Sequence, residues 1–229
     1  MHNETMTLAL HPSFLTATHE QLTAAAQDAS LPDAVLQQWF GQARPSNDSA
    51  LQHKAQWFTK SPAFDEQLRE RFEVAVQAAL GGSLSHWAEQ GPWQSLALTV
   101  LLDQFTRNIY RGTPQSFAGD AQALALALKV QSAGTDLELP EVVRIFLYLP
   151  LEHAEDLDMQ QRSVDAFAAL VQMAPDASSH EFLIGTLDYA YKHQEVVERF
   201  GRFPHRNAIL GRASSPEETE YLAQPGSGF

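Results

Sequence analysis

Three short segments of the chain concentrate the arginine, carboxylate and histidine side chains that could do chemistry. The first segment, 101–111, carries Asp103, Arg107 and Arg111, which are four residues apart and so share one face of a helix. Asp103 can neutralise one of the two arginines, and the other then needs a second carboxylate or a bound anion. Since the residues just before them are almost all apolar, we expect these charges to be partly buried, where an unpaired charge is costly.

The second segment, 149–156, places a histidine among three carboxylates: Glu152, His153, Glu155 and Asp156. Carboxylates this close raise one another's pKa unless a cation lies nearby. The cation could be an arginine or a metal ion, because histidine with aspartate or glutamate is a ligand set for manganese, iron or zinc. A metal-dependent enzyme is therefore one interpretation. Because the chain lacks a tight spacing of several histidines, the sequence itself predicts no metal site and no cofactor.

The third segment, 199–212, holds four arginines in fourteen residues, among them Arg202 and Arg206, and also contains His205. The first and third segments together contain six of the fifteen lysine and arginine residues of a chain whose net charge is −13. The planar guanidinium group presents a fork of donors that suits carboxylate or phosphate. This clustering of arginine in an acidic chain predicts a cleft that binds a small anionic ligand.

The predicted cleft brings the three segments together. Four arginines would contact the ligand: Arg107, Arg111, Arg202 and Arg206. Four carboxylates would hold those arginines in place: Asp103, Glu152, Glu155 and Asp156. If the protein is an enzyme, the first candidates for proton transfer are the histidines of the second and third segments, because histidine titrates near neutral pH: His153 and His205.

Two further interpretations fit the same residues. The acidic second segment could simply pair with the basic first and third segments and pin the C-terminal region to the helical core, since buried ion pairs often fix geometry without chemistry. The protein could also be an interaction module with a groove for peptides. Recessed arginines favour a small-molecule pocket, whereas arginines on an open concave face favour a peptide groove.

Composition and charge narrow the classes of function. The 229 residues include no cysteine, which excludes disulfides, thiolate zinc sites, iron–sulfur clusters and a thiol nucleophile, and we expect a cytoplasmic protein. No apolar stretch approaches the roughly 20 residues that span a bilayer. The net charge of −13 disfavours nucleic acids and anionic membranes as partners. The pattern predicts no particular oligomeric state.

The elements that must position the charged segments are predicted to be helices. Apolar residues recur at helical spacing, and no alternating strand pattern appears. We expect Pro150 to stop the helix that precedes the second segment. Four predicted helices carry or flank the three segments, over residues 93–110, 140–149, 155–173 and 179–200.

Short connections between these helices favour antiparallel neighbours. We therefore predict an all-α fold, a compact array of antiparallel helix pairs that is tetratricopeptide-like. The chain has no stretch with the composition of an interdomain linker, so we predict a single helical domain over residues 1–229. Residues 1–31 are expected to form a loosely attached N-terminal extension of that domain.

The three segments resemble the bacterial family called domain of unknown function 924. As written in this chain, the motifs that carry the resemblance are LDQFTRNIYR at 102–111, FLYLPLEHAED at 146–156 and FGRFPHRNAILGR at 200–212. The likeness runs from about Val35 to the C-terminal Phe229. It also includes three shorter motifs: WF at 57–58, FD at 64–65 and FAGD at 117–120.

Two positions depart from the family's pattern. Thr106 stands where the family usually has proline, and Ala154 stands where it usually has serine. The resemblance implies a helical fold similar to tetratricopeptide arrays. It implies no established activity, so there are no catalytic residues to carry over.

Overall fold

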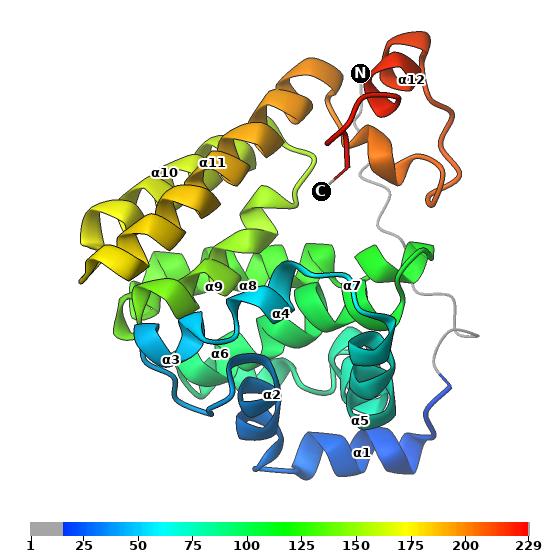
Figure 1. The fold of residues 1–229 in the computed structure, drawn as a ribbon. Helices are drawn as coiled ribbons and strands as arrows, with labels where there is room; N and C mark the ends of the chain where they lie inside the picture. Colours follow the sequence, from blue (N-terminus) through cyan, green and yellow to red (C-terminus); the bar gives the residue numbers. More distant parts are fainter. Residues whose placement is uncertain (1–15, 229) are drawn as a thin grey trace.

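The computed structural model describes residues 16–228, and every regular element in that part of the chain is helical (Figure 1). The all-α prediction is confirmed, whereas the tetratricopeptide-like arrangement stays a prediction. Among these residues, none of the helices has the length and apolar character to cross a membrane. The α-helices are α1 (His19–Gln27), α2 (Leu31–Phe40), α3 (Asn47–Leu51), α4 (Lys54–Phe58), α5 (Pro62–Leu80), α6 (Pro92–Thr99), α7 (Thr106–Ile109), α8 (Asp120–Ala133), α9 (Glu141–Glu152), α10 (Leu157–Met173), α11 (Ala177–Phe200) and α12 (Pro216–Leu222).

Short elements of other geometry connect these helices. One is a π-helical segment, η3 (Val100–Phe105), that joins α6 to α7. The others are 3₁₀ turns: η2 (Ser85–Glu89), η4 (Pro114–Phe117), η5 (Thr135–Glu138) and η6 (Pro204–Arg206).

One apolar core holds together the helices that carry the first two charged segments. Val100 to Leu102 of η3 and Ile145 to Leu147 of α9 are almost fully buried in it. The ring of Trp39 packs edge-to-face against Phe105 and Phe146, with centroids 5.7 and 5.6 Å apart. Because aromatic pairs of this geometry add stability beyond burial, η3 and α9 are fixed relative to each other.

The third charged segment belongs to a smaller apolar cluster. Figure 1 shows α10 and α11 side by side as a long antiparallel hairpin, after which the chain turns back through η6 to α12. Val196 and Val197 of α11 pack there with Phe203, and Tyr221 of α12 covers them. This cluster is small, so polar contacts must help to hold the C-terminal region in place.

The helix predicted over 93–110 is divided by η3 into α6 and α7. A π-helical turn contains an extra residue, and such turns often occur at functional sites. The buried hydroxyl of Thr106 follows the wide turn and donates to the carbonyl of Leu102 at 2.7 Å. A proline at this position would offer neither a hydroxyl nor an N–H. Thr106 thus supplies a local bond at the end of η3.

The prediction that Pro150 stops a helix is wrong, because α9 continues to Glu152. A proline so close to the end of a helix removes only one late hydrogen bond. The buried side chains of Leu149 and Leu151 keep this last turn in the core, and the His153 N–H donates to the Leu149 carbonyl. The second segment therefore begins on the final turn of α9.

Part of the expected N-terminal extension is described. Helix α1 packs against α5, and Leu22 and Ala25 contact the main core. The N–H of Ala17 also donates to the side chain of Gln77 on α5 at 2.7 Å. Residues 1–15 of the expected extension lie outside the described residues, so its loose attachment stays a prediction.

Candidate functional site

Asp103 of η3 is the innermost charged group of the site, with no exposed surface. One carboxylate oxygen lies 3.0 Å from Arg107 Nη1 and 2.8 Å from His153 Nδ1, and the other accepts a bond from Gln104. Burial alone would raise the pKa of Asp103, but the charge of Arg107 and the contact with His153 together lower it to about 2. Asp103 is therefore an ionised acceptor at neutral pH.

The bond to Asp103 sets the protonation of His153. Since the carboxylate only accepts, the His153 nitrogen that faces it, Nδ1, must donate. Burial and the positive charge of Arg107 lower the pKa of His153, against the opposing effect of Asp103. At neutral pH the ring is therefore neutral, with its hydrogen on Nδ1 and a free lone pair on Nε2.

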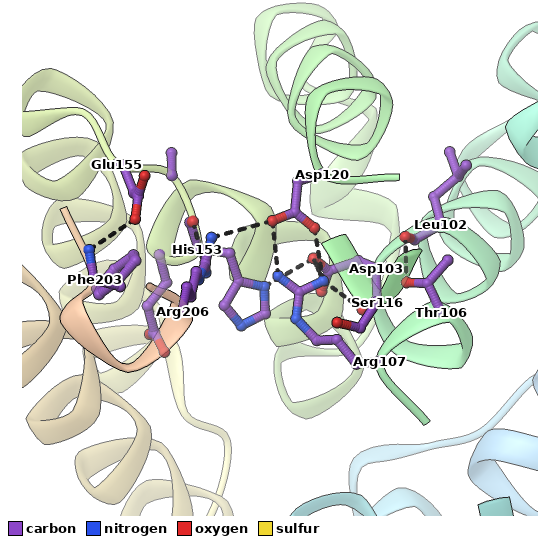
Figure 2. A network of polar contacts seen from close by, with 12 residues as sticks. Leu102, Asp103, Thr106, Arg107, Ser116, Asp120, His153, Glu155, Phe203 and Arg206 are labelled. Atoms are coloured by element: carbon purple, nitrogen blue, oxygen red, sulfur yellow. Dashed lines mark hydrogen bonds and ion pairs between the residues drawn. The ribbon is translucent and has the colours of Figure 1, made fainter. Parts of the chain in front are cut away.

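Asp120, the first residue of α8, joins two arginines that are far apart in sequence (Figure 2). Arg107 donates to both of its oxygens, at 2.8 and 3.1 Å, and Arg206 Nη1 lies 3.4 Å from Oδ2. The second segment is joined as well, because Arg206 Nη2 donates to the backbone carbonyl of His153 at 3.0 Å. All three charged segments thus meet at one point. We call Asp103, Arg107, Asp120, His153 and Arg206 the charged centre.

Arg206 has the least complete set of partners in the charged centre. Its guanidinium carbon lies 4.7 Å from the ring centre of Phe117 and 4.6 Å from that of Phe203. Its side chain is only 8% exposed, and its buried Nε has no hydrogen-bond acceptor among the described residues. Burial lowers the pKa of Arg206 to about 10, although Asp120 opposes this. The surroundings therefore compensate the charge of Arg206 only in part.

Glu155 holds the third segment in place through the backbone and an arginine. Its carboxylate accepts from the Phe203 N–H at 2.8 Å and from both terminal nitrogens of Arg212, at 2.6 and 2.9 Å. Burial would raise the pKa of Glu155, but the bonds from Arg212 and Phe203 lower it overall. Glu155 thus acts mainly on the loop that carries Arg206, and its charge also stabilises the positive charge of Arg206.

Two buried titratable groups lie beside the charged centre. Glu152 Oε1 is 3.2 Å from His193 Nδ1, and Oε2 has no described hydrogen-bond partner. Burial, together with the charge of Asp103, raises the pKa of Glu152 to about 8, so the group is largely protonated at neutral pH. His205 lies next to Arg206, and its burial and that positive charge lower its pKa to about 4.

Three of the predicted site residues have their contacts elsewhere. Arg111 forms a bidentate pair with Asp65 of α5, at 2.7 and 2.9 Å. Arg202 pairs with Glu218 of α12, at 2.6 and 2.8 Å. The exposed Asp156 caps α10 by accepting from the Met159 N–H. The structure therefore brings Asp103, Arg107, His153 and Arg206 into one network but leaves these three outside it.

Sequence reasoning missed Asp120, Asp65 and the aromatic neighbours of Arg206. Their signal was present in the short FD and FAGD motifs at 64–65 and 117–120, which supply both carboxylates and Phe117. Asp65 neutralises Arg111, and Asp120 completes the partners of Arg107. Of the two alternatives expected from the sequence, further carboxylates balance the charge of the first segment, so this balance does not by itself demand a bound anion.

Other features of the surface lie away from the charged centre. One hollow between α3 and α11 is lined by residues that include Leu51, Phe182 and Gly185, and another is bordered by Pro32 and Trp87. Within residues 16–228, no group of three or more histidine, cysteine, aspartate or glutamate side chains is arranged to hold a metal ion.

Comparison with known proteins identifies the family to which the chain belongs. The family model described as "Bacterial protein of unknown function (DUF924)" matches residues 35–226. The chain belongs to this family. A solved structure titled as a protein of unknown function from Agrobacterium tumefaciens is 38% identical, with a TM-score of 0.71, over 85% of this chain and 98% of that one. No curated protein matches. The charged centre of this DUF924 protein lies wholly within the matched residues.

Proposed function

We propose that the protein binds a small anion at the charged centre, with Arg206 and Arg107 as donors. The observation that carries this proposal is the unmet capacity of Arg206. Its buried Nε has no described acceptor. The carboxylate that pairs with Arg206, Asp120, lies 3.4 Å from Nη1 and also serves Arg107. A buried donor without a partner costs about 1–3 kcal/mol, and an anion would provide the missing acceptor.

The electrostatics support the same conclusion. The lowered pKa of Arg206 means that its surroundings stabilise its positive charge less well than water does, so an added negative charge is favourable. Solvent reaches the centre at Arg107, His153 and Asp120, whose side chains are 18%, 14% and 22% exposed. An anion would approach from that side. Arginines as recessed as these favour a small ligand over a peptide.

Each member of the charged centre then has a distinct role. Arg107 and Arg206 bind the anion, and Asp103 is a positioning residue that fixes the tautomer and orientation of His153. His153 Nε2 is the atom that would accept a proton if the bound anion reacts. His205 lies beside Arg206, and its lowered pKa leaves it neutral as well.

Thermal unfolding with added anions tests this proposal. Inorganic phosphate and citrate are titrated against the unaltered chain, Arg107→Ala and Arg206→Lys, at constant ionic strength. A ligand at ten times its Kd stabilises the native state by about 1.4 kcal/mol, so we expect a concentration-dependent rise in Tm. Arg206→Lys keeps the positive charge but lacks Nε and should lose most of that rise.

Arg111→Ala is the matched control, because Arg111 lies four residues after Arg107, just past the end of α7, but pairs with Asp65 outside the centre. It should respond to anions as the unaltered chain does. If neither anion raises the Tm of the unaltered chain, or if Arg206→Lys responds fully, the proposal is overturned.

A further inference from the structure

The charged centre contains acceptors as well as donors, and this combination restricts the anion that it can take. We infer that the ligand is an oxyanion that still carries a proton, namely a protonated phosphate group, and not a fully ionised oxyanion such as sulfate. This inference rests on the proposed anion site and names its ligand class.

Asp120 is the first acceptor that a ligand would meet. Of the two carboxylates in the centre, Asp120 is more exposed than Asp103. Its oxygens accept three hydrogen bonds, two from Arg107 and a longer one from Arg206. A carboxylate has about four lone-pair positions, so one remains for a donor. An oxyanion without a proton can only place its own negative charge against Asp120.

His153 is the second acceptor, and its geometry follows from Asp103. Because Nδ1 donates to Asp103 at 2.8 Å, the free Nε2 can only accept while the ring is neutral. A P–OH group would supply a donor to this acceptor in place of the solvent that reaches His153. Five elements, η3, α7, α8, α11 and η6, place titratable or charged side chains around His153. These side chains are Asp103, Arg107, Asp120, His193, His205 and Arg206.

Charge counting leads to the same ligand class. The positive charges of Arg107 and Arg206 are matched by the negative charges of Asp103 and Asp120, so the five residues of the centre together are close to neutral. Donors remain at Arg206 Nε, and acceptors remain at Asp120 and His153. A group that both accepts and donates matches this combination. Protonated phosphate can accept from Arg206 and donate its one P–OH to Asp120 or to His153.

A comparison of three divalent anions at pH 8 tests the inference by calorimetry or thermal shift. Inorganic phosphate retains one proton at this pH, whereas sulfate and methyl phosphate have none, because the second pKa of a phosphate ester is near 6. At equal ionic strength we expect phosphate to bind at least tenfold more tightly than sulfate. Methyl phosphate should bind weakly at pH 8 and regain its affinity near pH 5.5 if the natural ligand is an ester. No recovery would indicate free phosphate as the source.

Asp120→Asn tests the acceptor directly. An asparagine keeps the size of the side chain but removes its charge, so sulfate should no longer be excluded and the phosphate-to-sulfate affinity ratio should fall toward one. Asp65→Asn is the matched control, since Asp65 holds Arg111 outside the centre in the same bidentate way. That variant should keep the full ratio.

The outcomes separate this inference from the proposed function. Equal affinities for phosphate and sulfate on the unaltered chain would overturn the protonated ligand but leave an anion site. A lack of response to every anion tested would overturn the site itself. The comparison on the unaltered chain remains decisive even if Asp120→Asn does not fold.

Discussion

Gly119 shows how closely the backbone approaches the charged centre. A Cβ atom built on this residue would lie 2.1 Å from the carbonyl oxygen of Leu102 in η3. Backbone at this position cannot move aside as a flexible side chain can. The absence of a side chain at Gly119 therefore lets the start of α8 approach η3, and Asp120 follows directly in the chain. A glycine with an ordinary backbone conformation is required here for space.

We predict that Gly119→Ala lowers the free energy of unfolding by about 1–3 kcal/mol, the range typical of overpacking. The same change should weaken anion binding, because it displaces Asp120 from Arg107. Urea unfolding measures the first effect, and the phosphate thermal shift measures the second. Gly185→Ala is the control, because a Cβ on this helical glycine meets nothing within 4 Å. That variant should be neutral or slightly stabilising. Equal stability of the two variants would show that the contact with Leu102 is unimportant.

At the scale of elements, local signals predicted most of the helices but not their irregularities. Helices α10 and α11 have aspartate N-caps and apolar stripes, which are visible in the sequence. The π turn of η3 has no such signal, since its neighbours are apolar on all sides. The continuation of α9 through Pro150 depends on core packing, which outweighs the local cost of proline.

The same distinction applies to the candidate site. The pair Asp103–Arg107 was predictable because it joins residues one helical turn apart. The contacts of Asp120 with Arg107 and Arg206 join three separate elements, so they depend on how α7, α8 and η6 pack. Spacing along the chain carries no information about such contacts.

Polar contacts, more than apolar burial, hold the C-terminal segment 201–228 against the rest of the fold. Arg212 makes two bonds to Glu155 and one each to the Phe203 carbonyl and the Asn207 side chain. We predict that Arg212→Ala speeds hydrogen exchange of the segment about tenfold or more, while amides of α6 and α9 keep their protection. Arg199→Ala removes an exposed pair with Glu217 and should change little. Uniform loss of protection would instead mean that the segment unfolds with the core.

For the molecule as a whole, acid response follows from groups that are buried without charge. Three histidines close to one another have lowered pKa values, mainly because of burial: His153, His193 at about 3 and His205 at about 4. The unfolded chain protonates them near pH 6.5, whereas the folded chain does not until lower pH. Stability is therefore lost as pH falls from about 6.5 toward 4. Glu152 opposes this trend, because its pKa of about 8 keeps its proton on in the folded chain.

We predict that each of these histidines contributes up to about 1.4 kcal/mol of lost stability per pH unit over that interval. His193→Gln removes one titrating group, so its free energy of unfolding should fall less steeply between pH 6.5 and 4.5 than that of the unaltered chain. Because Glu152 contacts His193 at 3.2 Å, the comparison is repeated in chains that also carry Glu152→Gln, where this carboxyl no longer titrates. The exposed His180 provides the control, and His180→Gln should leave the slope unchanged. Urea unfolding at several pH values measures the slopes, and identical slopes for all three chains would mean that His193 is charged in the folded protein.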